Sequence, residues 1–250
     1  MLSSLKRIVT LTGRNLKEII RDPVSLIFII IVPLLLEIIF YFLFRNLTDQ
    51  FAMKYLAPGI VVFSESFLAL FVGLLITLDR GTSFLTRLYV SKARSFEFIF
   101  SYALAVLPIC LVQSILFFLV GGIIDVSIFS IGMIWAILLS VVTSLFFVSI
   151  GILFGSLFNE KAIGGVTSII ITAQSILSGM WFPLEGLNET IIIIMKVLPF
   201  KNATMLIQNV ASGIGEPFND FFFPLIIVLS YTIVTFIAAI LVFRSKMKAK

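Results

Sequence analysis

Residues 79–97 read DRGTSFLTRLYVSKARSFE and form a charged stretch between two long apolar segments. At about 100° per residue, the apolar side chains of this stretch fall on one helical stripe and the basic ones lie mainly off it. The apolar set is Phe84, Leu85, Leu88 and Tyr89, and the basic set is Arg80, Arg87 and Lys92. This pattern predicts a short amphipathic helix. The alternative is a solvated loop anchored by positive charge, the common form of a basic segment between membrane spans.

The composition of the whole chain identifies the class of protein. Hydrophobic residues make up 60% of its 250 residues and charged residues only 12%, which excludes a soluble globular domain. The long apolar runs exclude a transmembrane barrel, whose strands alternate lipid-facing and lumen-facing residues. Helices remain as the spanning structure, so the sequence predicts an all-α integral membrane protein with a single domain over residues 1–250. One cysteine and no histidine exclude an internal disulfide and His-dependent chemistry, and we predict neither catalytic residues nor a metal site.

Apolar runs long enough to cross a bilayer, which takes about 20 residues, divide the chain. We predict spans at 24–44, 56–78, 98–122, 131–157, 163–182 and 221–243. Residues 1–22 before them predict an amphipathic helix that lies in the membrane interface, its basic face toward anionic headgroups and its apolar arc in the acyl boundary. Leu11 alone departs from this sorting. Asp22-Pro23 ends the helix, because the residue before proline is disfavoured in the α region.

The distribution of positive charge predicts the orientation. Most of the 18 Lys and Arg residues fall in segments on the same side as the two termini. The positive-inside rule therefore predicts a multi-pass cell-membrane protein with both termini and residues 79–97 in the cytoplasm. Residues 183–220 then face outward. Within them, 190–197 is apolar but too short to cross, which predicts a re-entrant hairpin with breaks at Pro183, Gly186 and Pro199. Trp181 is its interfacial aromatic, and Glu185 also belongs to the predicted hairpin.

Polar residues within the predicted spans are candidates for a substrate pathway. Glu37 and Glu65 are costly in a membrane, and no Lys or Arg within the spans pairs with them. They either line a pathway or form interhelical hydrogen bonds; the two readings are balanced for Glu65, and the hydrogen bond is favoured for Glu37. Gln113 and Gln174 are weaker candidates. The 27 Phe residues fit lipid contact and core packing better than a drug-binding cage.

Small residues in the fifth predicted span permit close helix packing. This packing forms either between two protomers or within one chain. The residues concerned are Gly164, Gly165, Thr167, Ser168 and Ser175.

Several motifs follow one another in an order typical of one family. They are Arg21-Asp22-Pro23 before the first span, Pro33 inside it, Arg80-Gly81-Thr82 followed by Leu85 and Leu88, SGMWFPLE at 178–185, and Leu198-Pro199-Phe200. With these motifs the chain resembles, over essentially its whole length, the membrane-spanning permeases of ABC-2 type (type V) ABC exporters, in their drug- and antibiotic-resistance branch. One departure is Lys92 after Ser91, where the family often has proline.

The resemblance implies that two permease protomers form a pathway driven by two cytoplasmic ATPases. Residues 79–97 then correspond to the family's coupling helix, whose apolar stripe docks in a groove of the ATPase. The chain has no Gly-Lys dipeptide and hence no phosphate-binding loop, so ATP and Mg would be bound by a separate ATPase subunit and the chain itself is no enzyme. The coupling residues would be Arg80, Gly81, Thr82, Phe84, Leu85, Arg87, Leu88, Tyr89 and Arg94.

The function expected from this resemblance is ATP-driven export of an amphipathic or hydrophobic small molecule or peptide, such as a drug, antibiotic or antimicrobial peptide. The expected partners are ABC ATPase subunits, a second permease protomer in a homodimer or heterodimer, and membrane lipids, with no nucleic acid. Alternatives on the same fold are a lipid, glycan or ion exporter, or a non-translocating immunity or sensory subunit. A self-sufficient channel or secondary transporter would predict internal repeats, and the sequence has no convincing one. An intramembrane enzyme would need a nucleophile, base or metal set that the sequence lacks.

Overall fold

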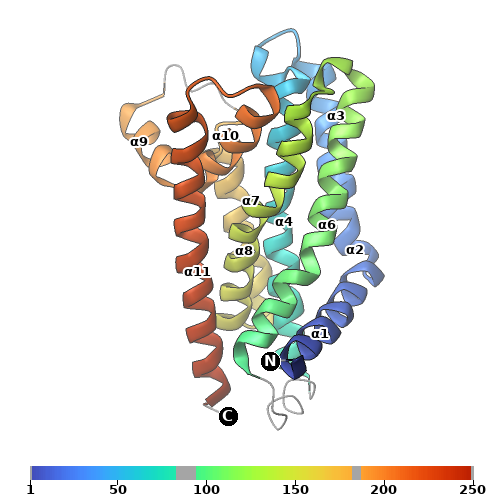
Figure 1. Ribbon diagram of the computed structural model, residues 1–250, viewed down its shortest axis with the longest axis vertical. Helices are drawn as coiled ribbons and strands as arrows, with labels where there is room; N and C mark the ends of the chain where they lie inside the picture. The colour runs from blue at the N-terminus through green and yellow to red at the C-terminus, as the bar shows by residue number, and fades with distance from the viewer. Residues whose placement is uncertain (1, 83–93, 182–186, 249–250) are drawn as a thin grey trace.

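The computed structural model describes residues 2–82, 94–181 and 187–248, and all regular elements in these ranges are helical (Figure 1), which confirms the predicted all-α class. The α-helices are α1 (Leu2–Arg21), α2 (Pro23–Leu26), α3 (Val32–Phe44), α4 (Met53–Gly81), α6 (Ser95–Ile124), α7 (Ile131–Leu157), α8 (Glu160–Leu177), α9 (Glu189–Val197), α10 (Pro199–Ser212) and α11 (Phe223–Lys248). Short 3-10 turns are η2 (Asp49–Phe51) and η3 (Val126–Ile128), and π-helical turns are η1 (Ile27–Ile31) and η4 (Phe218–Phe222).

Five helical segments in the described ranges are long and apolar enough to cross a membrane. They are Pro23–Phe44, Met53–Gly81, Ser95–Ile124, Ile131–Leu157 and Phe218–Ser245, and they overlap five of the predicted runs. Helices α9 and α10 pass the same test only as a pair, which is bent by 77°. The sixth predicted run, 163–182, falls largely on α8, which ends at Leu177 and is not among the five. A span at this position stays a prediction.

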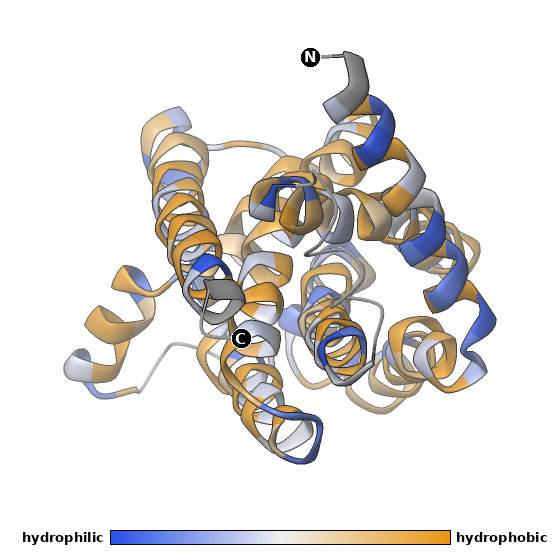
Figure 2. Cartoon of the chain, turned by 90° about the horizontal axis from the view of Figure 1, so that it is seen from below, coloured by the Kyte–Doolittle hydropathy of each residue, from blue (hydrophilic) through white to orange (hydrophobic). Residues whose placement is uncertain are grey.

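Both termini lie at one end of the bundle, which we call the terminal end, while α9 and α10 lie at the other, distal end (Figure 1). Helix α1 crosses the terminal end obliquely and packs against α6. Viewed from this end, hydrophilic residues gather along α1, whereas the spans are mainly hydrophobic (Figure 2). Asp22 caps α2 by accepting a hydrogen bond from the Val24 amide at 3.1 Å, so the chain turns into the first span at the predicted Asp22-Pro23 junction.

Helix α4 is the centre of the bundle and packs against α3, α6, α7, α8 and α10. Its closest neighbour is α7, because glycine lets the two backbones touch. A Cβ atom at Gly151 would lie 2.4 Å from the Ala69 carbonyl oxygen, and one at Gly155 would lie 2.6 Å from the Gly73 carbonyl oxygen. Two residues of small size, four apart on each helix, therefore form the contact, as in the small-xxx-small packing of membrane helices.

Candidate functional site

The structure describes the two ends of residues 79–97. Asp79, Arg80 and Gly81 end α4, and Thr82 follows exposed to solvent or lipid; Arg94 precedes α6 and is also exposed. The remaining predicted coupling residues, Phe84, Leu85, Arg87, Leu88 and Tyr89, lie outside the described residues.

Both carboxylates of this stretch bind arginines of α1. Arg7 donates two hydrogen bonds to Glu97, from Nε at 2.9 Å and from Nη2 at 2.7 Å. Two helical turns later, Arg14 Nη2 donates to Asp79 Oδ1 at 2.7 Å, and its Nη1 binds Asp79 Oδ2. We call these four residues the α1 clamp. The hydrogen bond from Arg7 to Glu97 also raises the pKa of the Arg7 guanidinium.

Further polar contacts complete the environment of the α1 clamp. The Tyr102 hydroxyl donates to Asp79 at 2.6 Å, Ser4 binds Glu97, and Asn15 Nδ2 donates to the Ser101 hydroxyl at 3.2 Å. The side chain of Glu97 is 0% exposed and that of Asp79 is 4% exposed. Carboxylates this buried are tolerated when cations and hydrogen-bond donors compensate them, and the α1 clamp supplies both.

The α1 clamp corrects the predicted orientation of α1. The sequence predicted that its basic face meets lipid headgroups, but Arg7 and Arg14 turn toward α6 and α4, while Lys6, Lys17 and Arg21 remain exposed. Leu11, the residue that departed from the amphipathic sorting, packs against the core. The helix therefore has a third, inward face. The spacing of Ser4, Arg7, Leu11 and Asn15 at three or four residues was the sequence signal for that face.

Arg80 contacts the permease itself. Its Nη1 donates to the carbonyl oxygens of Gly155 at 2.7 Å and Phe158 at 2.9 Å. These carbonyls belong to the last turn of α7 and the residue after it, where a helix has no internal donors left. A guanidinium at this position also opposes the negative end of the helix dipole. Arg80 therefore joins the end of α4 to the end of α7, beside the undescribed segment 83–93.

The two intramembrane glutamates are both 0% exposed, and they differ in their partners. Glu65 on α4 accepts a hydrogen bond from Thr143 Oγ1 on α7 at 2.9 Å, whereas its Oε2 has no partner among the described residues. Glu37 on α3 points at α6: a Cβ atom at Gly121 would lie 3.1 Å from Glu37 Oε1. Within the described chain neither oxygen of Glu37 is hydrogen-bonded. Glu65 thus forms an interhelical hydrogen bond, which is one of the two roles predicted for it.

The two predicted glutamines are also fully buried. Gln174 Nε2 on α8 donates to Thr204 Oγ1 on α10 at 3.1 Å, so it connects the fifth predicted span to the distal pair. Gln113 on α6 has no hydrogen-bond partner among the residues that the structure describes.

An apolar pocket opens on the side of the bundle formed by α3, η2, α4 and α8. It has a volume of about 560 Å³. Aromatic rings dominate its lining, which consists of Leu36, Phe40, Phe44, Phe51, Phe63, Ser175, Ile176 and Trp181. We call it the aromatic pocket. It brings together Ser175 and Trp181, which the sequence assigned to two different features.

Trp181 organises the rings of the aromatic pocket. Its ring meets Phe40 edge-on at a centroid distance of 4.6 Å and Phe63 at 5.7 Å. Such edge-to-face geometry is the favoured one for aromatic pairs. Gln50 Nε2 donates to the Gly179 carbonyl oxygen at 2.5 Å and so holds the preceding turn. The sequence favours lipid contact and core packing for the Phe residues and does not predict this pocket. The four-residue spacing of Leu36, Phe40 and Phe44 was the available signal.

Helix α8 presents part of the predicted interface set on an exposed face. Gly164, Gly165 and Ser168 are exposed, and among the described residues no neighbouring atom lies within 4 Å of a Cβ atom built at either glycine. Thr167 does not belong to this face, because it is 0% exposed and donates to the Ile163 carbonyl oxygen of its own helix. Ser175 is half-buried in the aromatic pocket.

The predicted outer hairpin corresponds to α9 and α10 at the distal end. Pro199 begins α10 at the bend, where its missing N–H costs nothing, and Asn202 Nδ2 donates to the carbonyl oxygens of Lys196 and Leu198 at 2.8 and 2.7 Å. Trp181 lies before the hairpin in the aromatic pocket. Pro183 and Glu185 lie outside the described residues.

The pockets, ion pairs and interhelical hydrogen bonds described above suit the binding of a molecule and the movement of helices. In residues 2–82, 94–181 and 187–248, no group of three or more His, Cys, Asp or Glu side chains could hold a metal ion. A search of curated proteins found no match to this chain. The sequence profile of the family described as ABC-2 type transporter matches residues 6–212, which extend from α1 to the end of α10. The chain therefore belongs to the ABC-2 type transporter family, as its membrane-spanning permease.

Proposed function

We propose that this permease exports an amphipathic or hydrophobic small molecule or peptide, of the drug, antibiotic or antimicrobial-peptide type. The aromatic pocket is the observation that carries this proposal. Its 560 Å³ lies in the usual range of small-molecule sites, and aromatic rings bind apolar and amphipathic ligands without requiring a particular polar pattern. Ser175 and the Trp181 indole N–H are the polar groups of its lining.

The proposal includes a dimer in which α8 contacts a second protomer. The exposed glycines of α8 leave room for close helix contact, and the aromatic pocket borders the same helix at Ser175 and Ile176. In such a dimer the aromatic pockets of both protomers would lie near the shared interface, where a cargo molecule could contact both.

The proposal also places the terminal end in the cytoplasm, where separate ATPase subunits bind residues 79–97. Positive charge concentrated at this end supports the orientation. The α1 clamp and Arg80 attach both ends of segment 83–93 to α1 and α7. A force applied by the ATPase to this segment would therefore reach α1, α4, α6 and α7 directly.

The cargo proposal is tested with the permease copurified with its ATPase from native membranes and reconstituted in vesicles. Tetraphenylphosphonium, an amphipathic cation, should stimulate ATP hydrolysis, whereas the polar sugar lactose should not. Trp181→Ala should abolish the stimulation and keep basal hydrolysis, because it removes the central ring of the aromatic pocket. Phe42→Ala, which changes a ring that is 59% exposed and outside the aromatic pocket, is the matched control. Equal stimulation in Trp181→Ala and the wild type would contradict the proposal.

The coupling proposal is tested by changing Leu85 and Leu88 together to Asp. This variant should insert normally but uncouple ATP hydrolysis from transport, because the apolar stripe would no longer dock in the ATPase. Copurification of the ATPase and cargo uptake into inverted vesicles are the two measurements. Normal transport in this variant would reduce the segment to a topological anchor, and a permease that purifies with no ATPase would contradict the whole exporter assignment.

A further inference from the structure

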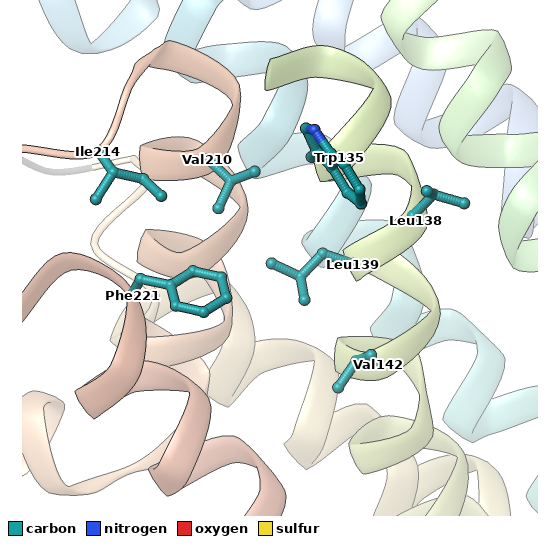
Figure 3. Close-up of a pocket in the computed structure, with 7 residues that line it drawn as sticks. All are labelled: Trp135, Leu138, Leu139, Val142, Val210, Ile214 and Phe221. Carbon is teal, nitrogen blue, oxygen red and sulfur yellow. The ribbon is translucent and has the colours of Figure 1, made fainter. Parts of the chain in front are cut away.

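A second apolar groove lies between α7 and a wall formed by the end of α10, the chain after it and η4. Figure 3 shows its walls: Trp135, Leu139 and Val142 on α7 face Val210, Ile214 and Phe221 across the gap. The groove has a volume of about 580 Å³ and shares no residue with the aromatic pocket. Along α7 it extends from Trp135 to Val142, roughly 10 Å at 1.5 Å per residue.

Specific contacts keep this groove open in its present shape. At its distal end α7 and α10 touch, since a Cβ atom at Gly132 would lie 2.4 Å from the Val210 carbonyl oxygen. On the opposite wall the π-helical turn η4 carries Phe221 into the groove. Asp220 holds this turn by accepting hydrogen bonds from the amides of Gly215 at 3.0 Å and Glu216 at 2.7 Å. The groove is therefore part of the folded structure and is not a gap between loosely packed side chains.

The surroundings of the groove indicate what occupies it. Its two sides include segments that are long and apolar enough to cross a membrane, α7 on one side and the segment that begins at Phe218 on the other. All of its lining side chains are apolar except for the indole N–H of Trp135. An elongated apolar groove between two such segments fits the hydrocarbon chain of a membrane amphiphile.

The rim of the groove indicates the charge of that amphiphile. Glu216 is exposed and lies two residues after Ile214, which is itself 45% exposed at the edge of the groove. Asp220 is occupied by backbone amides, whereas the exposed Glu216 accepts one hydrogen bond at Oε2, from Asn219 Nδ2 at 2.7 Å. A cationic amine would be attracted to this carboxylate while its chain lies in the groove.

We propose that this groove binds a membrane amphiphile with a protonated amine headgroup, its chain between α7 and η4 and its amine at Glu216. This site is separate from the aromatic pocket and does not depend on the cargo or on the ATPase. Its wall from Ile214 onward also lies beyond residues 6–212, the part of the chain that matches the family.

Trp135 provides a direct test, because it lines the groove and the chain has only one other tryptophan, Trp181. The full chain with Trp181→Phe is reconstituted in vesicles of phosphatidylcholine, and dodecylamine brominated at mid-chain is added. Bromine in contact with the indole quenches its fluorescence. Binding in the groove should give a saturable component of quenching, whereas partition into the bilayer alone gives quenching that rises without saturation. Dodecanol brominated at the same position should bind more weakly, because it has no charge.

Substitutions then separate the two parts of the site. Val142→Phe should remove the saturable component by filling the groove. Glu216→Gln, an exposed change that leaves the fold intact, should weaken amine binding about two- to fivefold and leave binding of the alcohol unchanged. Glu189→Gln, another exposed carboxylate at the distal end, is the matched control and should have no effect. Quenching that never saturates, or that is equal for amine and alcohol in the wild type and in Glu216→Gln, would overturn the proposal.

Discussion

At the scale of single residues, the buried carboxylates differ in their partners. Asp79 and Glu97 are compensated by arginines of α1, Glu65 accepts one hydrogen bond from Thr143, and Glu37 has no partner among the described residues. An unpaired polar group in an apolar interior costs about 1–3 kcal/mol, more if it is charged. The compensated pair lies beside the proposed ATPase contact, whereas the glutamates with spare oxygens lie inside the spans.

Glu65→Gln tests whether Glu65 belongs to the cargo pathway. Glutamine has the same size and keeps an oxygen that can accept from Thr143, so we expect wild-type thermal stability and unchanged cargo preference. Glu65→Ala should lower the stability by about 2–3 kcal/mol, because it removes this bond and leaves a cavity. Thermal unfolding in detergent and transport competition between two cargoes measure these outcomes. A changed preference in stable Glu65→Gln would instead place the side chain on the pathway.

At the scale of elements, α1 and α7 illustrate two ways of attaching a helix in this fold. Helix α1 is held by ion pairs at the terminal end, and α7 is held by backbone contact with α4 at Gly151 and Gly155. Ion pairs can exchange partners during a transport cycle, whereas a glycine contact tolerates little rearrangement because backbone atoms meet. We therefore expect α1 to move more than α7 when the ATPase acts.

A double-mutant cycle at the α1 clamp measures its strength. Arg14→Gln should cost about 2 kcal/mol of stability, because Asp79, with a side chain only 4% exposed, loses its counterion. Asp79→Asn should cost less, since the Arg14 side chain is 32% exposed and can reach water. The double variant should recover part of the loss. Lys17→Gln, an exposed change on the same helix, is the control, and additive losses in the cycle would show that the pair contributes nothing.

Gly151→Ala and Gly164→Ala should have opposite effects on the stability of the protomer. At Gly151 the new Cβ atom would lie 2.4 Å from the Ala69 carbonyl oxygen, so α4 and α7 must separate and the melting temperature should fall. At Gly164 no neighbouring atom of the residues that the structure describes lies within 4 Å of the new Cβ, so alanine should stabilise α8 by up to about 1 kcal/mol through its helix propensity. Thermal unfolding of both variants in detergent tests this, and equal effects would contradict the α4–α7 packing.

At the scale of the whole molecule, the two ends of the bundle carry different features. Both termini and the α1 clamp lie at the terminal end, and the bent pair α9–α10 lies at the distal end. The exposed glycines of α8 lie in its first turns, and the aromatic pocket is lined by Ser175 and Ile176 from its last turn. A dimer through α8 would bring the aromatic pockets together while leaving both ends accessible to their separate partners.

Gly165→Phe tests this dimer. The bulky ring should prevent close contact between two copies of α8 while leaving the protomer fold intact, because no described residue of the protomer has an atom within 4 Å of a Cβ built at Gly165. Light scattering coupled to size exclusion should show a monomer in place of the dimer. Val234→Phe, at a position on α11 that is 64% exposed, should keep the dimer. A dimer that persists in Gly165→Phe would place the protomer interface elsewhere.

Local patterns in the sequence were sufficient for the helical membrane class, five of the spans, the helix before them and the break at Pro199. Each of these depends on hydropathy or backbone chemistry within one short segment, which a sequence displays directly. The sequence left two roles open for Glu65, a pathway lining and an interhelical hydrogen bond, because its partner Thr143 lies on another helix. The coupling residues between 83 and 93 and the proposed function remain predictions.

The sequence by itself determined that residues 79–97 form a charged connection between two spans. Only the tertiary structure decided that Asp79 and Glu97 bind Arg14 and Arg7, that Leu11 faces inward, and that Phe40, Phe63 and Trp181 form one pocket. The physical reason is that burial in a membrane constrains each helix separately, because every span must satisfy its own backbone and expose apolar side chains to lipid. Which faces then meet depends on packing between helices far apart in the chain, and no local period encodes that choice.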